Sequence, residues 1–231
     1  METKLEMNKQ VPFSSGWTWI KQSFEVFKVI PIQALVLSLI IRVLMLVPLI
    51  NGVMQPFLVA RFAEMSHRVT KGDDYKFSEM FKGLFNNRTL VQLAMMNLLF
   101  FVVIDILTVI ISGYYDNKFL SILIAIILHF ILRIFMWLAP LICCFNPSIE
   151  PRAAMILSFK ASMHNVITLL LFGIIVCGFT ILAILPGLLS IQIFGFNVLT
   201  ILPIGLGLLV WCPIFDLSTY FMYKGIYNTN L

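Results

Sequence analysis

The chain has 231 residues, of which 60% are hydrophobic and only 12% are charged, whereas roughly 25% of the residues of soluble domains are charged. This composition excludes an ordinary soluble enzyme, and the apolar runs leave no stretch long enough for a separate soluble domain. The net charge of +5 is typical of a protein whose cationic side chains lie beside anionic lipid at the cytoplasmic membrane surface. We therefore expect membrane lipids as partners and no nucleic acid.

The first predicted element is an amphipathic helix at about residues 13–28, which begins after Pro12. Large apolar side chains recur on it at intervals of four or three residues, at Phe13, Trp17, Ile20, Phe24 and Phe27. A helix with this pattern, and with lysines on its other faces, lies in the plane of the membrane interface. We expect its lipid-facing residues to be Trp17, Trp19, Phe24 and Phe27.

Six apolar runs follow, at about residues 30–50, 53–65, 90–112, 119–145, 166–189 and 198–223. Five of them are long enough to cross a hydrocarbon core of about 30 Å. The short second run comes after Asn51-Gly52, a dipeptide that predicts a tight turn, so we interpret it as a returning helix that extends to about His67. Gly173 with Cys177, and Gly205 with Gly207, predict close packing of the last two crossings.

The predicted fold is an all-α, polytopic membrane helical bundle of about six transmembrane helices with short interfacial amphipathic helices. It forms one integral membrane domain over residues 1–231, with helix pairs at about 30–67, 90–145 and 166–223. Thirteen Lys and Arg residues fall on one side of these crossings and only Lys118 on the other. By the positive-inside rule, both termini are then cytoplasmic.

A threefold repeat of interfacial helix plus helical hairpin is a further hypothesis. Apolar stripes at residues 77–85 and 155–163 resemble the first amphipathic segment, and Phe24, Phe81 and Phe159 occupy equivalent positions when the three are aligned. The alignment also brings Asn87 and Asn165 to the same offset. Phe81 is then a lipid-facing residue like Phe24, although apolar sequences also align by chance.

Several short features together carry a family resemblance: Gly16-Trp17-Thr18-Trp19, the Phe24 and Phe27 stripe, Ser158-Phe159 with Asn165, Pro186-Gly187, and the late Pro213 with Ser218 and Tyr220. In these features the chain resembles a widespread proteobacterial family of uncharacterised six-helix inner-membrane proteins. That family is distantly similar to the membrane domain fused to some bacterial glycerophosphodiester phosphodiesterases. The resemblance implies a multi-pass protein of the bacterial inner membrane, and it implies no particular activity.

Five ionisable residues inside the apolar runs are the candidate functional groups: Arg42, Asp105, His129, Arg133 and Asp216. A charge at this depth is costly, so each is expected to face the bundle interior and to find a partner. Depth favours a pair between Arg42 and Asp105, with Arg133 able to reach either acid. Such groups either line a polar path for an ion or substrate, or form buried ion pairs that only fix how the helices pack.

The sequence contains no hydrolase, zincin or nucleotide-binding motif. His129 and Cys143 are about 21 Å apart along one helix, which is too far for a shared metal ion. We therefore expect no catalytic residue, no metal site and no cofactor. The first hypothesis is a non-enzymatic membrane bundle that acts on lipid, on envelope maintenance, on a membrane-protein partner or as a homo-oligomer, and the alternative is a small transporter or channel.

Overall fold

The computed structural model describes residues 10–44, 46–114 and 118–227, and these residues form helices joined by turns, with no strand among them. The chain divides into two compact units, each assembled from segments that are far apart in the sequence. The first comprises residues 1–40, 62–80 and 164–231, and the second comprises residues 41–61 and 81–163. The all-α class is confirmed, and the single-domain organisation stays a prediction.

In the first unit, helix α1 (Ser15–Val29) packs against α8 (Val166–Phe194) and α9 (Val198–Tyr227). The chain then turns by 111° into α2 (Pro31–Leu44). Pro31 explains this turn, because proline has no backbone N–H and disfavours helical geometry at the residue before it. The predicted helix at about residues 13–28 is thus present, and it forms part of a helical unit.

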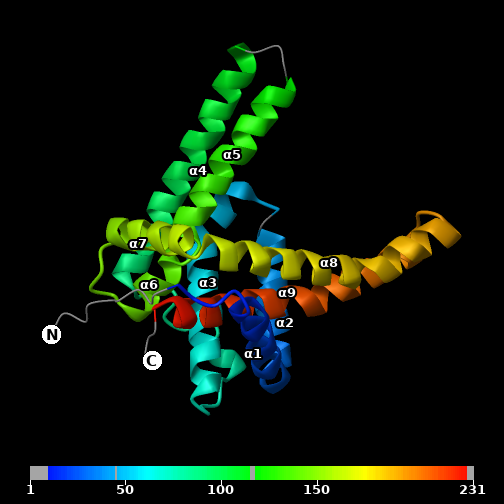
Figure 1. Cartoon of the computed structure of the whole chain (residues 1–231), viewed down its shortest axis with the longest axis horizontal. Helices are drawn as coiled ribbons and strands as arrows, with labels where there is room; N and C mark the ends of the chain where they lie inside the picture. Colours follow the sequence, from blue (N-terminus) through cyan, green and yellow to red (C-terminus); the bar gives the residue numbers. More distant parts are fainter. Residues whose placement is uncertain (1–9, 45, 115–117, 228–231) are drawn as a thin grey trace. The chain divides into compact units, whose positions relative to one another are not determined.

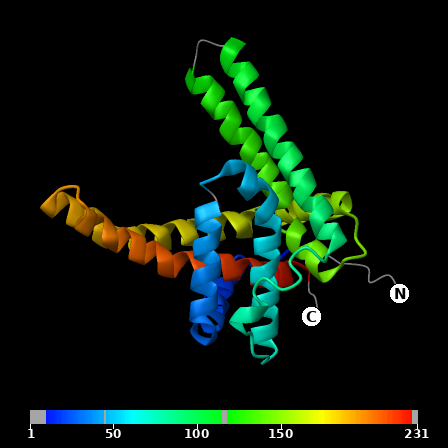
Figure 2. The same ribbon diagram turned by 180° about the vertical axis from the view of Figure 1, so that it is seen from behind.

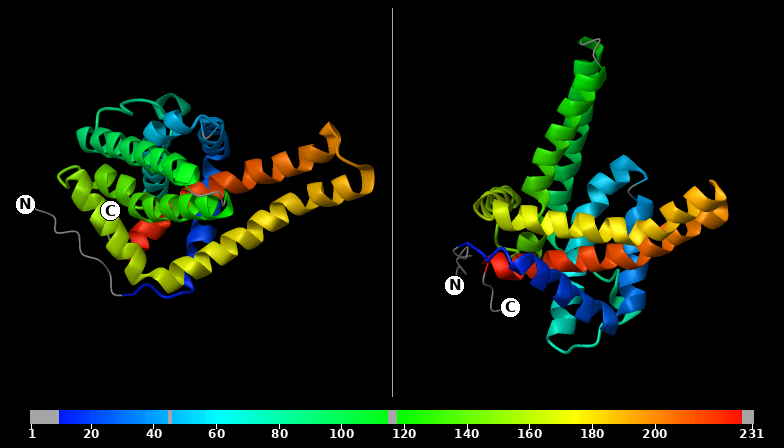
Figure 3. Two further views of the ribbon diagram at one scale, coloured as in Figure 1. Left: turned by 90° about the horizontal axis from the view of Figure 1, so that it is seen from above. Right: turned by 45° about the vertical axis from the view of Figure 1, so that its right-hand side comes forward.

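Helices α8 and α9 run side by side as a long hairpin (Figures 1 and 3). The sequence predicts close packing of these two helices from their glycines. A Cβ added at Gly207 would collide with the backbone of Ala183, and one added at Gly187 would collide with Ile204. Gly173 and Gly205 have no neighbouring atom within 4 Å of where a Cβ would stand. The predicted close approach of the two helices is confirmed, with Gly187 in place of Gly173.

In the second unit, α4 (Arg88–Tyr114) and α5 (Lys118–Met136) form another antiparallel hairpin (Figure 2). The short α6 (Ala139–Phe145) follows α5 after a break, because Pro140 cannot donate a backbone hydrogen bond. Ser158 of helix α7 (Pro151–His164) provides hydrogen bonds to backbone groups near this break. The Ser158 hydroxyl accepts from the Leu138 N–H at 3.0 Å and donates to the Ile134 carbonyl at 3.1 Å.

Two local predictions are wrong. Asn51 and Gly52 lie inside α3 (Pro48–Thr70), and the turn comes earlier, at residues 46–47. Gly52 faces α4, and an added Cβ there would stand 3.5 Å from Leu98, an ordinary van der Waals contact. The segment 77–85 forms only a 3₁₀ turn, η1 (Phe77–Glu79), followed by further turns. Gly83 has a φ of 68°, which is incompatible with a continuous α-helix there.

Among the described residues, four segments are long and apolar enough to cross a membrane: Arg88–Ile111, Ile122–Phe145, Val166–Phe194 and Leu199–Tyr227. The bent pair α1 and α2 would be a fifth if it counted as one span. Helix α2 has 14 residues, about 21 Å at 1.5 Å per residue, which is short of a full crossing. The helical membrane character is therefore supported, and six crossings and a threefold repeat stay predictions.

Candidate functional site

The α4–α5 hairpin brings together two of the five predicted ionisable residues. Asp105 of α4 and His129 of α5 lie with Oδ1 and Nε2 3.4 Å apart, which is ion-pair distance. The Asp105 side chain is 50% exposed and that of His129 33%, so neither is sealed inside the unit. The rings of Phe101 and His129 pack in a T-shaped arrangement, with their centroids 5.2 Å apart.

The other side of the histidine ring is held by its own helix. His129 Nδ1 lies 2.9 Å from the carbonyl oxygen of Ala125, one turn earlier on α5. Because a carbonyl oxygen can only accept, Nδ1 carries the hydrogen and Nε2 is the nitrogen that meets the carboxylate. The orientation of the ring is therefore fixed toward Asp105.

The expected pairing of Arg42 with Asp105 is corrected by this geometry. Within the described part of the chain, the ionic contact of Asp105 is with His129. Arg42 lies half-buried near the end of α2. Arg133 lies one turn after His129 on α5, with no acidic side chain within 4 Å among the described residues, so it does not make the predicted contact with an acid. Hydropathy identified these residues as candidates, but it did not indicate which helices meet.

Asp216 of α9 belongs to the first unit and contacts a hydroxyl group. Ser38 of α2 donates to Asp216 Oδ2 at 2.9 Å, and Thr219 donates to the Asp216 carbonyl at 2.7 Å. The sequence analysis did not single out Ser38. A serine within an apolar run was the available signal, because buried hydroxyls in membrane helices need a partner.

An apolar groove of about 260 Å³ lies on the α4–α5 hairpin beside α7. Neither Asp105 nor His129 lines it. Its walls are made entirely of apolar side chains from these three helices: Phe100, Ile104, Leu128, Ile131, Leu132, Phe135 and Met155. An ion would find no polar ligand there, whereas hydrocarbon would be well accommodated.

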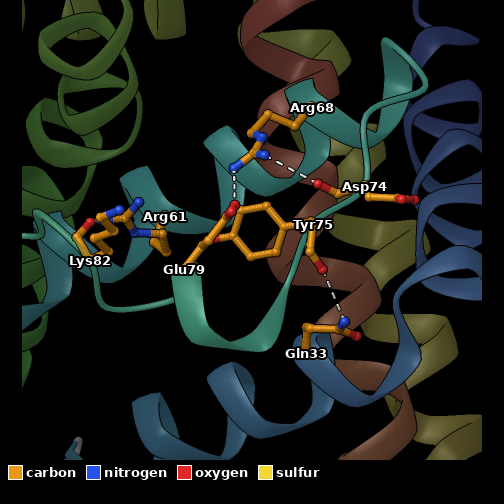
Figure 4. Close-up of polar contacts among 7 residues, drawn as sticks. All are labelled: Gln33, Arg61, Arg68, Asp74, Tyr75, Glu79 and Lys82. Atoms are coloured by element: carbon orange, nitrogen blue, oxygen red, sulfur yellow. Dashed lines mark hydrogen bonds and ion pairs between the residues drawn. The ribbon is translucent and has the colours of Figure 1, made fainter.

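Arg68 organises the loop that follows α3 (Figure 4). Its guanidinium donates to Glu79 Oε2 at 2.5 Å and to the Asp74 carbonyl at 3.1 Å, and it lies over the Tyr75 ring at 5.2 Å. The Tyr75 carbonyl in turn accepts from Gln33 Nε2 at 3.1 Å. The hydrogen bond that Arg68 donates to Glu79 is the main reason that the pKa of Arg68 is raised. These contacts hold the loop closed against α2.

His67 and Tyr220 form a second polar contact in the same unit. His67 Nδ1 lies 3.0 Å from the Tyr220 hydroxyl. Burial is the largest cause that lowers the pKa of His67, followed by the positive charges of Lys71 and Lys224, while Asp73 and Glu64 oppose them. The structure therefore favours the neutral form of His67.

The predicted lipid-facing aromatic residues divide into two groups. Trp17 is 53% exposed and Phe81 46%, and Phe24 and Phe27 are half-buried, so these four keep surface available to lipid. Trp19 is only 3% exposed because it packs edge-on against Phe172 of α8, and its prediction as a lipid-facing residue is wrong. In α1 the buried face is instead formed by Gly16, Trp19, Ile20, Ser23 and Val26.

Comparison with known proteins gives no match to a family model, to a curated protein or to a solved structure. The resemblance to six-helix inner-membrane proteins therefore stays an expectation.

Proposed function

We propose that this chain is a multi-pass membrane protein that binds a lipid acyl chain on its α4–α5 hairpin, and that it serves lipid handling or envelope maintenance without a catalytic centre of its own. The observation that carries the proposal is the groove, whose lining is wholly apolar. A hydrocarbon chain is the occupant that fits, because both helices are candidate membrane spans and the groove opens where bilayer hydrocarbon would surround them.

The exposed surface of the long helices also supports a lipid-facing protein. Only 11% of the apolar stretch of α4 and 11% of that of α8 is buried within the chain. Lipid or neighbouring membrane helices must cover the rest, since water would not solvate so much contiguous apolar surface favourably.

For the topology, we propose the bacterial inner membrane, with both termini in the cytoplasm and six crossings. Helix α2 and the apolar first part of α3, residues 48–60, would form the first pair of crossings, which is shorter than the other two pairs. Two polar residues at equivalent positions support the repeat: Asn87 before α4 donates to the Cys143 carbonyl at 2.9 Å, and Asn165 before α8 accepts from the Val11 N–H at 3.0 Å. In both places an asparagine ties the start of a long helix to another segment.

Photocrosslinking with a phospholipid that carries a diazirine in its acyl chain tests the lipid site. Ile104→Trp fills the groove, and we expect crosslinking to α4 and α5 to fall at least several-fold. Ile106→Trp is the matched control, since Ile106 is 54% exposed on the same helix and does not line the groove. Equal crosslinking in the two variants would contradict the proposed site.

The alternative, a small transporter or channel, is favoured by the Asp105–His129 contact. Proteoliposome flux measurements with a panel of ions, lipids and amphiphiles separate the two functions. Reproducible flux that Asp105→Asn abolishes would replace lipid binding by transport as the main function. Loss of lipid crosslinking in Ile104→Trp without any flux in the wild type is the result we expect.

A further inference from the structure

Helix α7 borders one end of the apolar groove. Met155 of α7 lines the groove together with Phe135 of α5, and Phe159 of α7 stacks on Phe135 with ring centroids 4.6 Å apart. This is the end of the hairpin at which α4 begins and α5 ends (Figures 1 and 2). The lining residues of α5 extend from Phe135 back to Leu128, about 10 Å at 1.5 Å per residue. A hydrocarbon chain that follows them therefore arrives at α7.

A basic side chain of α7 lies beside this end of the groove. Arg152 is one turn before Met155, and at about 100° per residue the two side chains project about 60° apart around the helix axis. Arg152 is exposed, and no acidic side chain among the described residues lies within 4 Å of it. Its guanidinium is thus available to an anion that lies next to the apolar lining.

The neighbouring segments carry an excess of positive charge. Residues 81–100, which lead into α4, and residues 133–163, which follow α5, contain five cationic side chains and one acid, Glu150. The cations are Lys82, Arg88, Arg133, Arg152 and Lys160. An ionised phosphate is complementary to this excess, and the guanidinium fork of an arginine matches its geometry. A choline or ethanolamine headgroup would instead add a further cation.

We propose that the groove and Arg152 together select an anionic phospholipid, whose acyl chain lies along α4 and α5 and whose phosphate is bound by the Arg152 guanidinium. This inference rests on the acyl-chain site of the proposed function and adds the class of lipid to it. An uncharged lipid would leave the arginine without a partner, and a soluble phosphate would leave the groove empty. A basic site at the cytoplasmic end of membrane helices is also where anionic lipid is concentrated.

Two phospholipid probes that carry the same diazirine acyl chain measure the selection. Phosphatidylglycerol is the anionic probe and phosphatidylcholine the zwitterionic one. Each is added at a low mole fraction to the full chain in phosphatidylcholine nanodiscs, and mass spectrometry measures the crosslinks on α4 and α5. Dividing by the crosslinks on α8 and α9 removes the general attraction of a cationic protein for anionic lipid.

Arg152→Gln should lower the anionic-to-zwitterionic ratio on α4 and α5 about fivefold, the factor that corresponds to about 1 kcal/mol per basic side chain at an anionic lipid surface. Lys160→Gln is the matched control, since it removes the same charge from an exposed position of the same helix. Its side chain projects about 140° from Met155, so the ratio should change less than about twofold. Arg152→Lys keeps the charge and should keep most of the preference.

A wild-type ratio of one, or equal ratios in the wild type and Arg152→Gln, would overturn the headgroup selection. The wild-type comparison needs no variant, so it decides the matter even if Arg152→Gln does not fold. Ile104→Trp separates this failure from that of the proposed function. If it still lowers crosslinking by both probes, the acyl-chain site stands and only the selection is wrong. If it leaves both unchanged, the site and the selection are wrong together.

Discussion

Replacing Gly207 by alanine is expected to open the α8–α9 hairpin. A Cβ at this position would overlap the carbonyl oxygen of Ala183 and lie 2.8 Å from its carbonyl carbon. Both are backbone atoms, so no side-chain rotation relieves the overlap and the two helices must separate. Small residues at such contacts are what allow membrane helices to approach closely.

The magnitude follows from two opposing effects. Overpacking at a close contact costs about 1–3 kcal/mol, while exchanging glycine for alanine within a helix gains up to about 1 kcal/mol. Gly205→Ala is the matched control, because an added Cβ there meets nothing within 4 Å and only the gain remains. Gly207→Ala should therefore be less stable than Gly205→Ala by about 2 kcal/mol.

Reversible unfolding in mixed detergent micelles measures this difference. Tryptophan fluorescence is a suitable probe, because Trp211 of α9 donates to Thr180 of α8 at 2.9 Å and stacks on Phe179 at 4.9 Å. Separation of the helices should alter its emission in Gly207→Ala before global unfolding. Equal stability of the two alanine variants would refute the close approach of these helices.

Three further predictions concern polar contacts. In thermal melts, Ser158→Ala should destabilise the protein by about 1–3 kcal/mol because it leaves the buried Leu138 N–H without an acceptor. Ser162→Ala is the control and should be neutral or stabilising, since the buried Ser162 hydroxyl has no hydrogen-bond partner among the described residues. The fold lowers the pKa of His67 from about 6.5, so the free energy of unfolding should fall as the pH drops from about 7.5 to about 5.5. His67→Asn should lessen that fall, whereas the control His164→Asn, at an exposed position, should not lessen it. Asn97→Ala should cost about 1 kcal/mol in unfolding measurements, because Asn97 donates to the Gly52 carbonyl at 2.7 Å.

Hydropathy predicts much of the helical layout, because the long runs correspond to α4, α8, α9 and the combination of α5 and α6. The turn at Pro31 and the break at Pro140 were not predicted. Hydropathy does not separate lipid-facing from protein-facing residues, because lipid chains are as apolar as leucine. That is why Trp19 was assigned to the lipid while the structure buries it against Phe172.

The candidate site shows the same limit. Asp105 and His129 were each recognisable as costly residues within apolar runs, but their pairing depends on the register between α4 and α5. Periodicity within one helix carries no information about that register. The choice of Arg42 as the partner of Asp105 rested on depth alone, and several residues on neighbouring helices share a depth.

In a bilayer, an uncovered apolar face is satisfied by lipid, so apolar packing alone selects poorly among helix arrangements. A polar group without a partner has no such substitute and therefore discriminates between arrangements. The described interhelical hydrogen bonds fit this reasoning. The Ser158 hydroxyl accepts from the Leu138 N–H at the break caused by Pro140, and the Thr180 hydroxyl accepts from the indole N–H of Trp211. It follows that loss of one such partner should perturb the fold more than truncation of a much larger exposed side chain such as Leu199, which is 80% exposed.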